Sequence, residues 1–175
     1  PEIGNFAVEN QRFGGEFSLS RMTWIKPNFL WMMYRNGWGT KEGQEVVLAI
    51  HLKMSAFMKY LENAEYCAYK PDKYENRDIW KTKMKESSVR LQWDPDHDPY
   101  GEKIARRAIQ IGVRNEMTAS YATKDFVLIE DISDFVREQH QHVLNNNLDE
   151  LIVPAEKPLI LQDKKLTDWL NIDYE

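Results

Sequence analysis

The alternation of apolar and polar residues along the chain predicts interleaved strands and helices. Residues 45–53 form a run that is apolar on both faces, which is typical of a central strand in a sheet. Residues 88–93 and 107–113 alternate between apolar and polar positions, and residues 126–130 form another short apolar run, so each segment predicts a strand. This interleaving favours an α+β or α/β class. We expect an α+β fold with a mixed, mainly antiparallel sheet flanked by helices.

Helical periodicity and helix end signals account for much of the remaining chain. The predicted helices lie at residues 2–9, 27–36, 56–64, 114–122, 134–145 and 165–170. Pro27 suits a first helical turn, where a missing N–H has no cost, and Gly37 suits a left-handed C-terminal cap. Ser55 and Ser133 precede two other predicted helices and are the expected N-terminal caps.

The helix predicted at residues 27–36 is apolar nearly all round, which predicts deep burial. Leu30, Trp31 and Tyr34 share one face by the spacing of three and four residues. Together with Met33, these three side chains are the expected core face of that helix.

Two polar stretches interrupt the apolar pattern. Residues 70–87 predict an exposed helix or an insertion, and residues 94–99, Asp-Pro-Asp-His-Asp-Pro, predict a loop. The alternating aspartates of that loop lack the glycine and the terminal glutamate of an EF-hand, which excludes that calcium motif.

Length and composition indicate a single domain over residues 1–175. The net charge is −5 and the pI is near 5.5, so the chain has no global basic field for nucleic acid. No run of about 18 apolar residues occurs, and we expect no membrane span.

Cys67 is the only cysteine, which excludes an internal disulfide and favours a reducing, cytoplasmic setting. The four histidines lack zinc-site spacing, so we expect no metal, and the pattern does not indicate an oligomeric state.

Aromatic and cationic residues gather in residues 21–38. Trp24 and Trp38 are candidates for stacking on a base or a nicotinamide. Arg21, Lys26 and Arg35 are candidates for contacts with phosphates, because cationic side chains bind anionic oxygens. The alternative interpretation is a tryptophan-rich core helix whose cations lie at the surface or in ion pairs.

Polar side chains on two predicted strands form a second group of candidates. Arg90, Gln92 and Asp94 project from one face of their strand, and Arg107 and Gln110 lie on or beside its expected neighbour. These groups would line a cleft if that face is concave. The alternative is the solvated face of a half-covered antiparallel sheet.

Three side chains are candidates for group-transfer chemistry. Asp94 and Glu130 offer a carboxylate, and Gln110 lies on a predicted strand where it would orient a substrate. The alternative for Glu130 is structural, because Asp131 and Ser133 beside it suit a helix cap.

Three strings resemble one bacterial and fungal family that is catalogued as a domain of unknown function, number 4291. They are residues 21–35, residues 90–95 (Arg-Leu-Gln-Trp-Asp-Pro) and residues 108–112 (Ala-Ile-Gln-Ile-Gly), and the resemblance extends to Pro-Ala-Glu-Lys-Pro at 154–158. Members usually carry a further strand ending in Tyr-Gln-Ala-Tyr before the position of Pro1. The resemblance implies that a site using that strand is incomplete here.

The element order also looks like that of ADP-ribosyltransferases of the DNA-modifying toxin type. This likeness implies NAD contacts for Arg21, Trp24 and Lys26, whereas Gln110 stands on the later strand where those enzymes use a glutamate. We therefore expect a pocket for a nucleotide-like anionic ligand, with an NAD-dependent transferase as its enzymatic form. The alternative is a non-enzymatic module that binds single-stranded nucleic acid or a protein partner. A purely structural role for Arg21 and Lys26 is a third interpretation.

Overall fold

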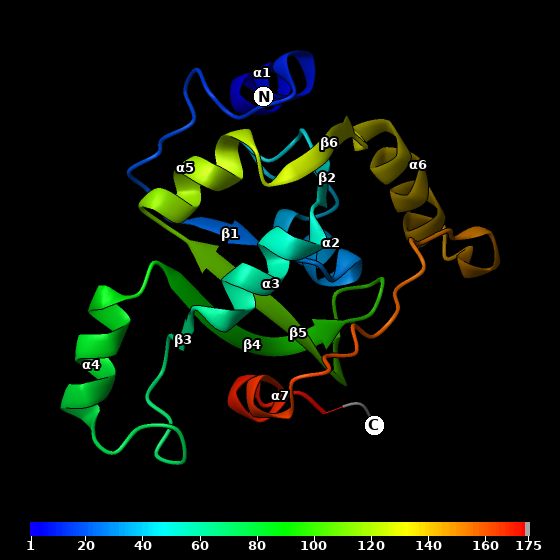
Figure 1. Ribbon diagram of the computed structural model, residues 1–175. Coiled ribbons are helices and arrows are strands. Elements are labelled where there is room, and N and C mark those ends of the chain that lie inside the picture. The colour runs from blue at the N-terminus through cyan, green and yellow to red at the C-terminus, as the bar shows by residue number, and fades with distance from the viewer. Residues whose placement is uncertain (174–175) are drawn as a thin grey trace.

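The computed structural model describes residues 1–173 (Figure 1). Its α-helices are α1 (Glu2–Asn10), α2 (Phe29–Asn36), α3 (Met54–Glu62), α4 (Arg77–Glu86), α5 (Glu116–Thr123), α6 (Ser133–Leu144) and α7 (Lys164–Leu170). Its strands are β1 (Thr23–Ile25), β2 (Leu48–Leu52), β3 (Ala64–Tyr66), β4 (Val89–His97), β5 (Lys103–Val113) and β6 (Phe126–Asp131). The expected α+β class, with a mainly antiparallel sheet, is confirmed.

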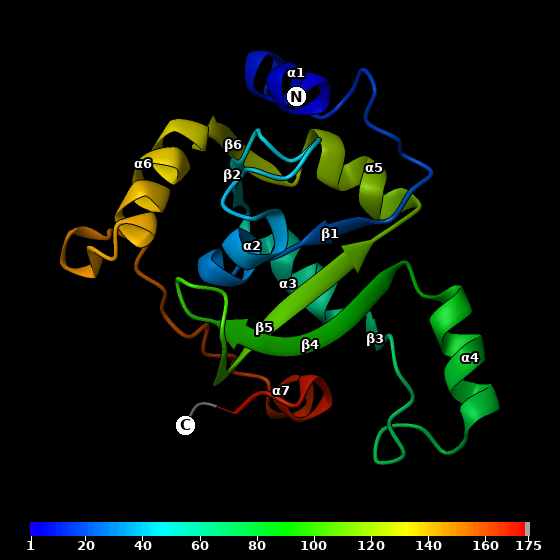
Figure 2. The ribbon, with the colours of Figure 1, turned by 180° about the vertical axis from the view of Figure 1, so that it is seen from behind.

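The larger sheet has the strand order β1-β5-β4-β3. β5 pairs antiparallel with both β1 and β4, and β3 lies parallel to β4. The β4–β5 hairpin is the longest element of this sheet and crosses the centre of the molecule (Figure 2). β3 was not expected from the sequence.

The smaller sheet consists of β2 and β6, paired antiparallel. The expectation of a central strand at residues 45–53 was wrong. The strand covers only Leu48–Leu52 and has one partner strand among the described residues. Its apolar character on both faces has another cause, because one face packs on the cluster around Ile129 and residues of the strand also line an internal cavity.

The main core lies on one face of the larger sheet. Leu91, Ile111 and Val113 are fully buried there, against Tyr60 of α3 and Leu170 of α7. Alternation along β4 and β5 therefore works as predicted, with apolar side chains on this face and polar side chains on the other.

Most predicted helices are present, with shifted ends. Gly37 forms the expected left-handed cap with φ 61°, and its N–H donates to the Met33 carbonyl. Ser55 is not a cap, because α3 already begins at Met54. Ser133 lies inside the first turn of α6, where its hydroxyl accepts from the Val47 N–H.

Tyr34 was expected in the core but is 46% exposed. The expected core residues Trp31 and Met33 are buried, together with Phe29 and Asn36, and Leu30 is partly buried. The periodicity of a helix that is apolar nearly all round cannot say which side meets the core.

The predicted loop at residues 94–99 is largely strand, because β4 continues to His97. The chain reverses at Asp98-Pro-Tyr-Gly101, where Gly101 has φ 87° and its N–H donates to the Asp98 carbonyl at 3.0 Å. This tight turn places His97 opposite Lys103 on β5. No helix within residues 1–173 has the length and apolar character to cross a membrane.

Candidate functional site

The polar face of the β4–β5 hairpin carries a fixed carboxylate. Gln92 lies opposite Gln110 in the strand register, and Asp94 follows on the same face. The Gln92 side-chain amide donates to Asp94 Oδ1 at 2.9 Å, and the Gln110 amide donates to Asp94 Oδ2. Both carboxylate oxygens therefore have a donor, which fixes the orientation of Asp94.

Helix α2 and the end of the hairpin complete a pocket around this carboxylate. The pocket has a volume of about 360 Å³, at the small end of the range for ligand sites. It is lined by Trp31, Tyr34, Arg35, Gln92, Asp94, Pro95, His97, Lys103 and Gln110. We call this the polar pocket. Four residues selected from the sequence meet there: Arg35, Gln92, Asp94 and Gln110.

Lys26 lies beside the polar pocket and is electrostatically coupled to it. Burial and the nearby Arg35 guanidinium lower the pKa of Lys26 from its ordinary 10.5 to about 8, against an opposing effect of Asp94. Its ammonium lies 5.8 Å from the centre of the Trp31 ring and 3.4 Å from the Trp24 carbonyl oxygen. Lysines with a lowered pKa gather at functional sites, so Lys26 is a candidate for a functional position.

His97 is a buried polar side chain without hydrogen bonds from its ring. It is 3% exposed, and neither ring nitrogen has a partner among the described residues. The exposed Tyr34 ring stacks on it, with ring centres 3.6 Å apart. Buried polar atoms are normally paired, so the two ring nitrogens of His97 are available to a ligand or to water at the edge of the pocket.

The polar pocket suits an anionic ligand. Arg35 and Lys103 contribute two cations and Asp94 one anion, and Lys26 adds further positive charge when it is protonated. The exposed Tyr34 ring offers an aromatic surface at the rim. The geometry therefore combines cations, a fixed hydrogen-bond acceptor and a ring for stacking.

Several residues selected from the sequence lie elsewhere. Arg21 is exposed and outside the pocket lining. Trp38 is buried with φ 55°, stacks on His140 and donates to the Pro99 carbonyl, so it is a core residue. Trp38 does not line the polar pocket, and its stacking on a ligand stays a prediction.

The remaining candidates are also separated from the polar pocket. Trp24 covers Gly112 and lines the larger cavity. Arg107 stacks on Trp93 and pairs with Asp173, so it lies on the opposite face of the hairpin from Gln110. Glu130 is on β6, where it pairs with His51. Glu130 therefore lies on a different sheet from Asp94 and Gln110.

Sequence reasoning missed Tyr34, His97 and Lys103 as pocket residues. Tyr34 was placed in the core, and His97 in a loop. The Asp98-Pro-Tyr-Gly101 turn was the available signal, because a turn of that composition places the residues on its two sides opposite each other.

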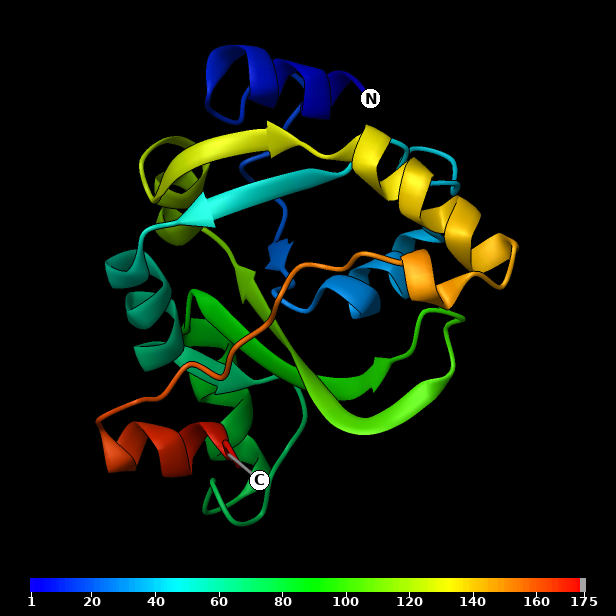
Figure 3. The same ribbon diagram turned by 90° about the vertical axis from the view of Figure 1, so that its right-hand side faces the viewer.

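A larger cavity of about 1530 Å³ lies between the two sheets. Residues 151–162, which contain no helix or strand, cross its opening in an extended conformation and are called the strap here. Figure 3 shows this orange segment between the β2–β6 pair and the β4–β5 hairpin.

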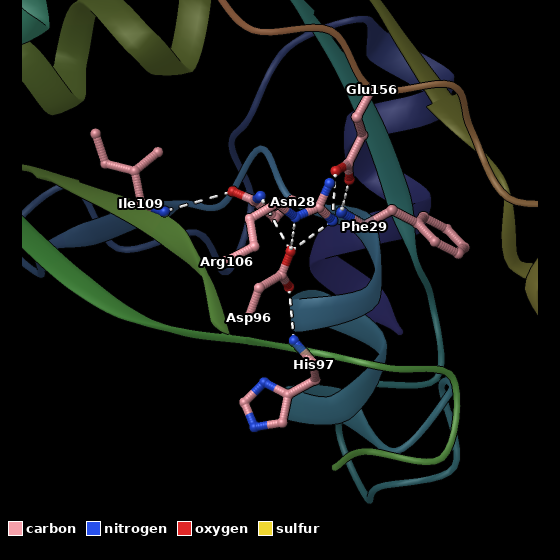
Figure 4. A network of polar contacts seen from close by, with 7 residues as sticks. All are labelled: Asn28, Phe29, Asp96, His97, Arg106, Ile109 and Glu156. Carbon is pink, nitrogen blue, oxygen red and sulfur yellow. Dashed lines mark hydrogen bonds and ion pairs between the residues drawn. The ribbon is translucent and has the colours of Figure 1, made fainter. Parts of the chain in front are cut away.

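A polar network attaches the strap to the hairpin and to α2 (Figure 4). Glu156 accepts from the Phe29 N–H at 2.8 Å and pairs with Arg106 at 3.0 Å. Arg106 also pairs with the fully buried carboxylate of Asp96 at 2.6 Å, and Asn28 donates to the same carboxylate at 3.4 Å. Asp96 therefore links the hairpin to both the strap and the start of α2.

Comparison with known proteins identifies a family but no individual protein that resembles this chain. The chain matches no curated protein and no solved structure. The likeness to ADP-ribosyltransferases consequently receives no support from these comparisons. One family model matches residues 1–159, so this chain belongs to the family described as "Domain of unknown function (DUF4291)".

Proposed function

We propose that the polar pocket binds a nucleotide-like anion. The observation that supports this most is the convergence of Arg35, Lys103 and the fixed Asp94 carboxylate on one small pocket. A guanidinium and an ammonium bind a phosphate, the carboxylate accepts from an amino or hydroxyl group, and Tyr34 stacks on the base.

The test is calorimetric titration of the protein with AMP, ADP and NAD. Arg35→Ala is expected to weaken binding by about tenfold or more, because hydrogen bonds to charged groups contribute about 1.5–3 kcal/mol. Arg21→Ala is the matched control, since Arg21 is exposed and outside the pocket. Absence of binding by every nucleotide at millimolar concentration, or equal loss in both variants, would contradict the proposal.

The enzymatic form of the proposal is ADP-ribosyl transfer from NAD. The bond between nicotinamide and ribose would break, neutral nicotinamide would leave, and a nucleophile would bond to the ribose carbon. Asp94 would stabilise the cationic ribose and accept the proton of the nucleophile. Release of nicotinamide by the wild type, lost in Asp94→Asn, tests this step separately from binding.

The non-enzymatic alternative is binding of single-stranded nucleic acid. The net charge of −5 opposes it, although Arg35, Lys103 and Lys26 form a local positive area. A steep fall in oligonucleotide affinity with salt concentration would favour this alternative, because each phosphate contact releases counterions.

A further inference from the structure

The imidazole of His97 is an exception in the hydrogen bonding of this protein. His97 ends β4 and is 3% exposed, and both of its ring nitrogens are buried without a hydrogen bond. Within residues 1–173, no other buried side-chain nitrogen or oxygen lacks a hydrogen bond. A buried polar atom without a partner destabilises a fold, so an apolar ring would suit this position better unless the nitrogens have a further role.

The backbone around His97 fixes the place of the ring. The His97 N–H donates to Asp96 Oδ1 at 2.8 Å, and His97 lies opposite Lys103 in the hairpin register. The ring points away from Asp96 and Arg106, as Figure 4 shows, and His97 belongs to the lining of the polar pocket. The network around Asp96 therefore holds the residue but leaves its ring nitrogens unpaired.

The ring of Tyr34 covers the imidazole. The two rings are nearly parallel, with an angle of 10° between their planes and 3.6 Å between their centres. Tyr34 also packs on the turn at Gly101, where an added Cβ would lie 3.3 Å from the Tyr34 ring.

The Tyr34 side chain has no polar contact that opposes its rotation. Its hydroxyl forms no hydrogen bond within residues 1–173, and the residue is exposed at the rim of the pocket. Exposed side chains change rotamer within picoseconds to nanoseconds. A turn of the Tyr34 ring away from His97 would open the imidazole to the pocket.

The cations beside His97 have no carboxylate of their own. Lys103 lies opposite His97 on β5, and Arg35 follows Tyr34 on α2. Both line the polar pocket, and neither forms an ion pair within residues 1–173. A neutral imidazole adds one N–H donor in either tautomer. All three side chains therefore donate, and a phosphate presents several anionic oxygens that accept.

We propose that Tyr34 is a movable cover, and that the imidazole of His97 beneath it donates a hydrogen bond to the phosphate of the ligand. Arg35 and Lys103 bind the same phosphate. When Tyr34 turns away, the ring face that stacked on His97 becomes free to stack on the base. This inference rests on the proposed function, because it takes the polar pocket as the site of a nucleotide. It adds the residue that recognises the phosphate and the movement that uncovers it.

The test is calorimetric titration of the wild type, His97→Phe and Arg35→Ala with AMP. Phenylalanine keeps a flat ring under Tyr34 and removes both nitrogens, so His97→Phe should unfold at the same or a higher urea concentration than the wild type. Its affinity for AMP should fall by about tenfold or more, because a hydrogen bond to a charged group is lost. A loss of affinity without a loss of stability distinguishes a ligand contact from a structural residue.

Nitrogen NMR of the histidine side chains gives a second measurement, on the wild type itself. AMP should shift the ring nitrogen signals of His97, which are identified by their absence from the spectrum of a His97 variant. His51 and His142 are internal controls, since they lie on β2 and α6 and do not line the polar pocket. Their signals should stay in place. Unchanged His97 signals in AMP-saturated protein would contradict the proposed contact.

Chemical modification tests the cover. Diethyl pyrocarbonate reacts with accessible imidazole nitrogens, so His97 should be modified faster in Tyr34→Ala than in Tyr34→Phe, which keeps the covering ring. Saturating AMP should slow the modification of His97 in Tyr34→Ala, because the phosphate then occupies the imidazole. Mass spectrometry of the digested protein measures both rates.

The outcomes that overturn this inference differ from those that overturn the proposed function. If AMP affinity is lost in Arg35→Ala but kept in His97→Phe, the imidazole serves water and not the ligand, and the proposed function stands. Equal modification of His97 in Tyr34→Ala and Tyr34→Phe would show that Tyr34 is not a cover. Absence of AMP binding by the wild type at millimolar concentration, together with absence of binding by ADP and NAD, would overturn both proposals.

Discussion

The lowered pKa of Lys26, beside the polar pocket, makes the stability of the protein depend on pH. Its pKa of about 8 lies below its ordinary value of 10.5, so the unfolded chain binds more protons than the folded protein between these two pH values. The free energy of unfolding therefore gains a contribution that rises with pH across this window. Lys26→Met should remove that rise, which urea unfolding of both proteins at pH 7.5 and 10 would measure.

The control for this prediction is Lys81→Met. Lys81 lies on α4, and its side chain is 59% exposed. This variant should keep the pH dependence of the wild type. An equal flattening in both variants would mean that Lys26 is not specifically perturbed. The same titration predicts weaker binding of anions above pH 8, because Lys26 then loses its charge.

Trp38 and Tyr34 separate packing from binding within one segment. Trp38 is 6% exposed, so Trp38→Ala should lower the free energy of unfolding by about 3–5 kcal/mol. Tyr34 is 46% exposed, and Tyr34→Ala should cost less than about 1 kcal/mol while it weakens binding at the polar pocket. Denaturant unfolding measures the stability of both variants, and nucleotide titration measures binding by Tyr34→Ala. A large stability loss in Tyr34→Ala would contradict the assignment of Tyr34 to ligand binding.

At the scale of the elements, the buried carboxylate of Asp96 holds the β4–β5 hairpin and, through Arg106, the strap in place. Asp96 is fully buried and accepts from Arg106, Asn28 and the His97 N–H. Asp96→Ala should therefore lower the free energy of unfolding by about 2–4 kcal/mol, because charged hydrogen bonds are lost inside the protein. Urea unfolding monitored by tryptophan fluorescence measures the change.

Glu156→Gln is the matched comparison for Asp96→Ala. The Glu156 side chain is partly exposed, and its amide replacement keeps an acceptor for the Phe29 N–H, so it should cost less than about 1 kcal/mol. If Glu156→Gln destabilises the protein as much as Asp96→Ala does, the strap and not the buried carboxylate is the principal support of this region.

Local sequence patterns predicted which helices and strands form better than they predicted which strands pair with each other. Gly37 was identified as a cap because a left-handed cap depends only on adjacent residues. Gln92 and Asp94 were placed on one face because alternation is intrinsic to a strand. β2 was taken for a central strand because an apolar run looks the same beside a second strand and beside a cavity. Strand pairing depends on distant residues, and no local pattern specifies it.

The candidate site was predictable to the same extent. Arg35, Gln92, Asp94 and Gln110 meet as their residue types suggested. Trp38 and Glu130 were chosen for their chemistry, but the path of the chain carries them to the core and to the other sheet. Residue type indicates what a side chain can do, whereas the hairpin register decides which side chains act together.

On the scale of the whole molecule, the cavity separates two sheets that we expect to differ in stability. The larger sheet has four strands and a core of fully buried side chains such as Leu91 and Ile111. The β2–β6 pair lies across the cavity from it, with its apolar β2 residues only partly buried. A two-stranded sheet is marginal without such packing.

We therefore expect the β2–β6 pair to open before the larger sheet does. In native-state hydrogen exchange, the amides of Ala49 and His51 should exchange through openings that cost at least about 1 kcal/mol less than those of Leu91 and Ile111. Gln11→Ala removes the side chain that bonds the outer edge of β6, and it should lower the opening free energy of this pair only. A single opening free energy for all four amides, changed equally by Gln11→Ala, would show that the two sheets unfold as one cooperative unit in spite of the cavity between them.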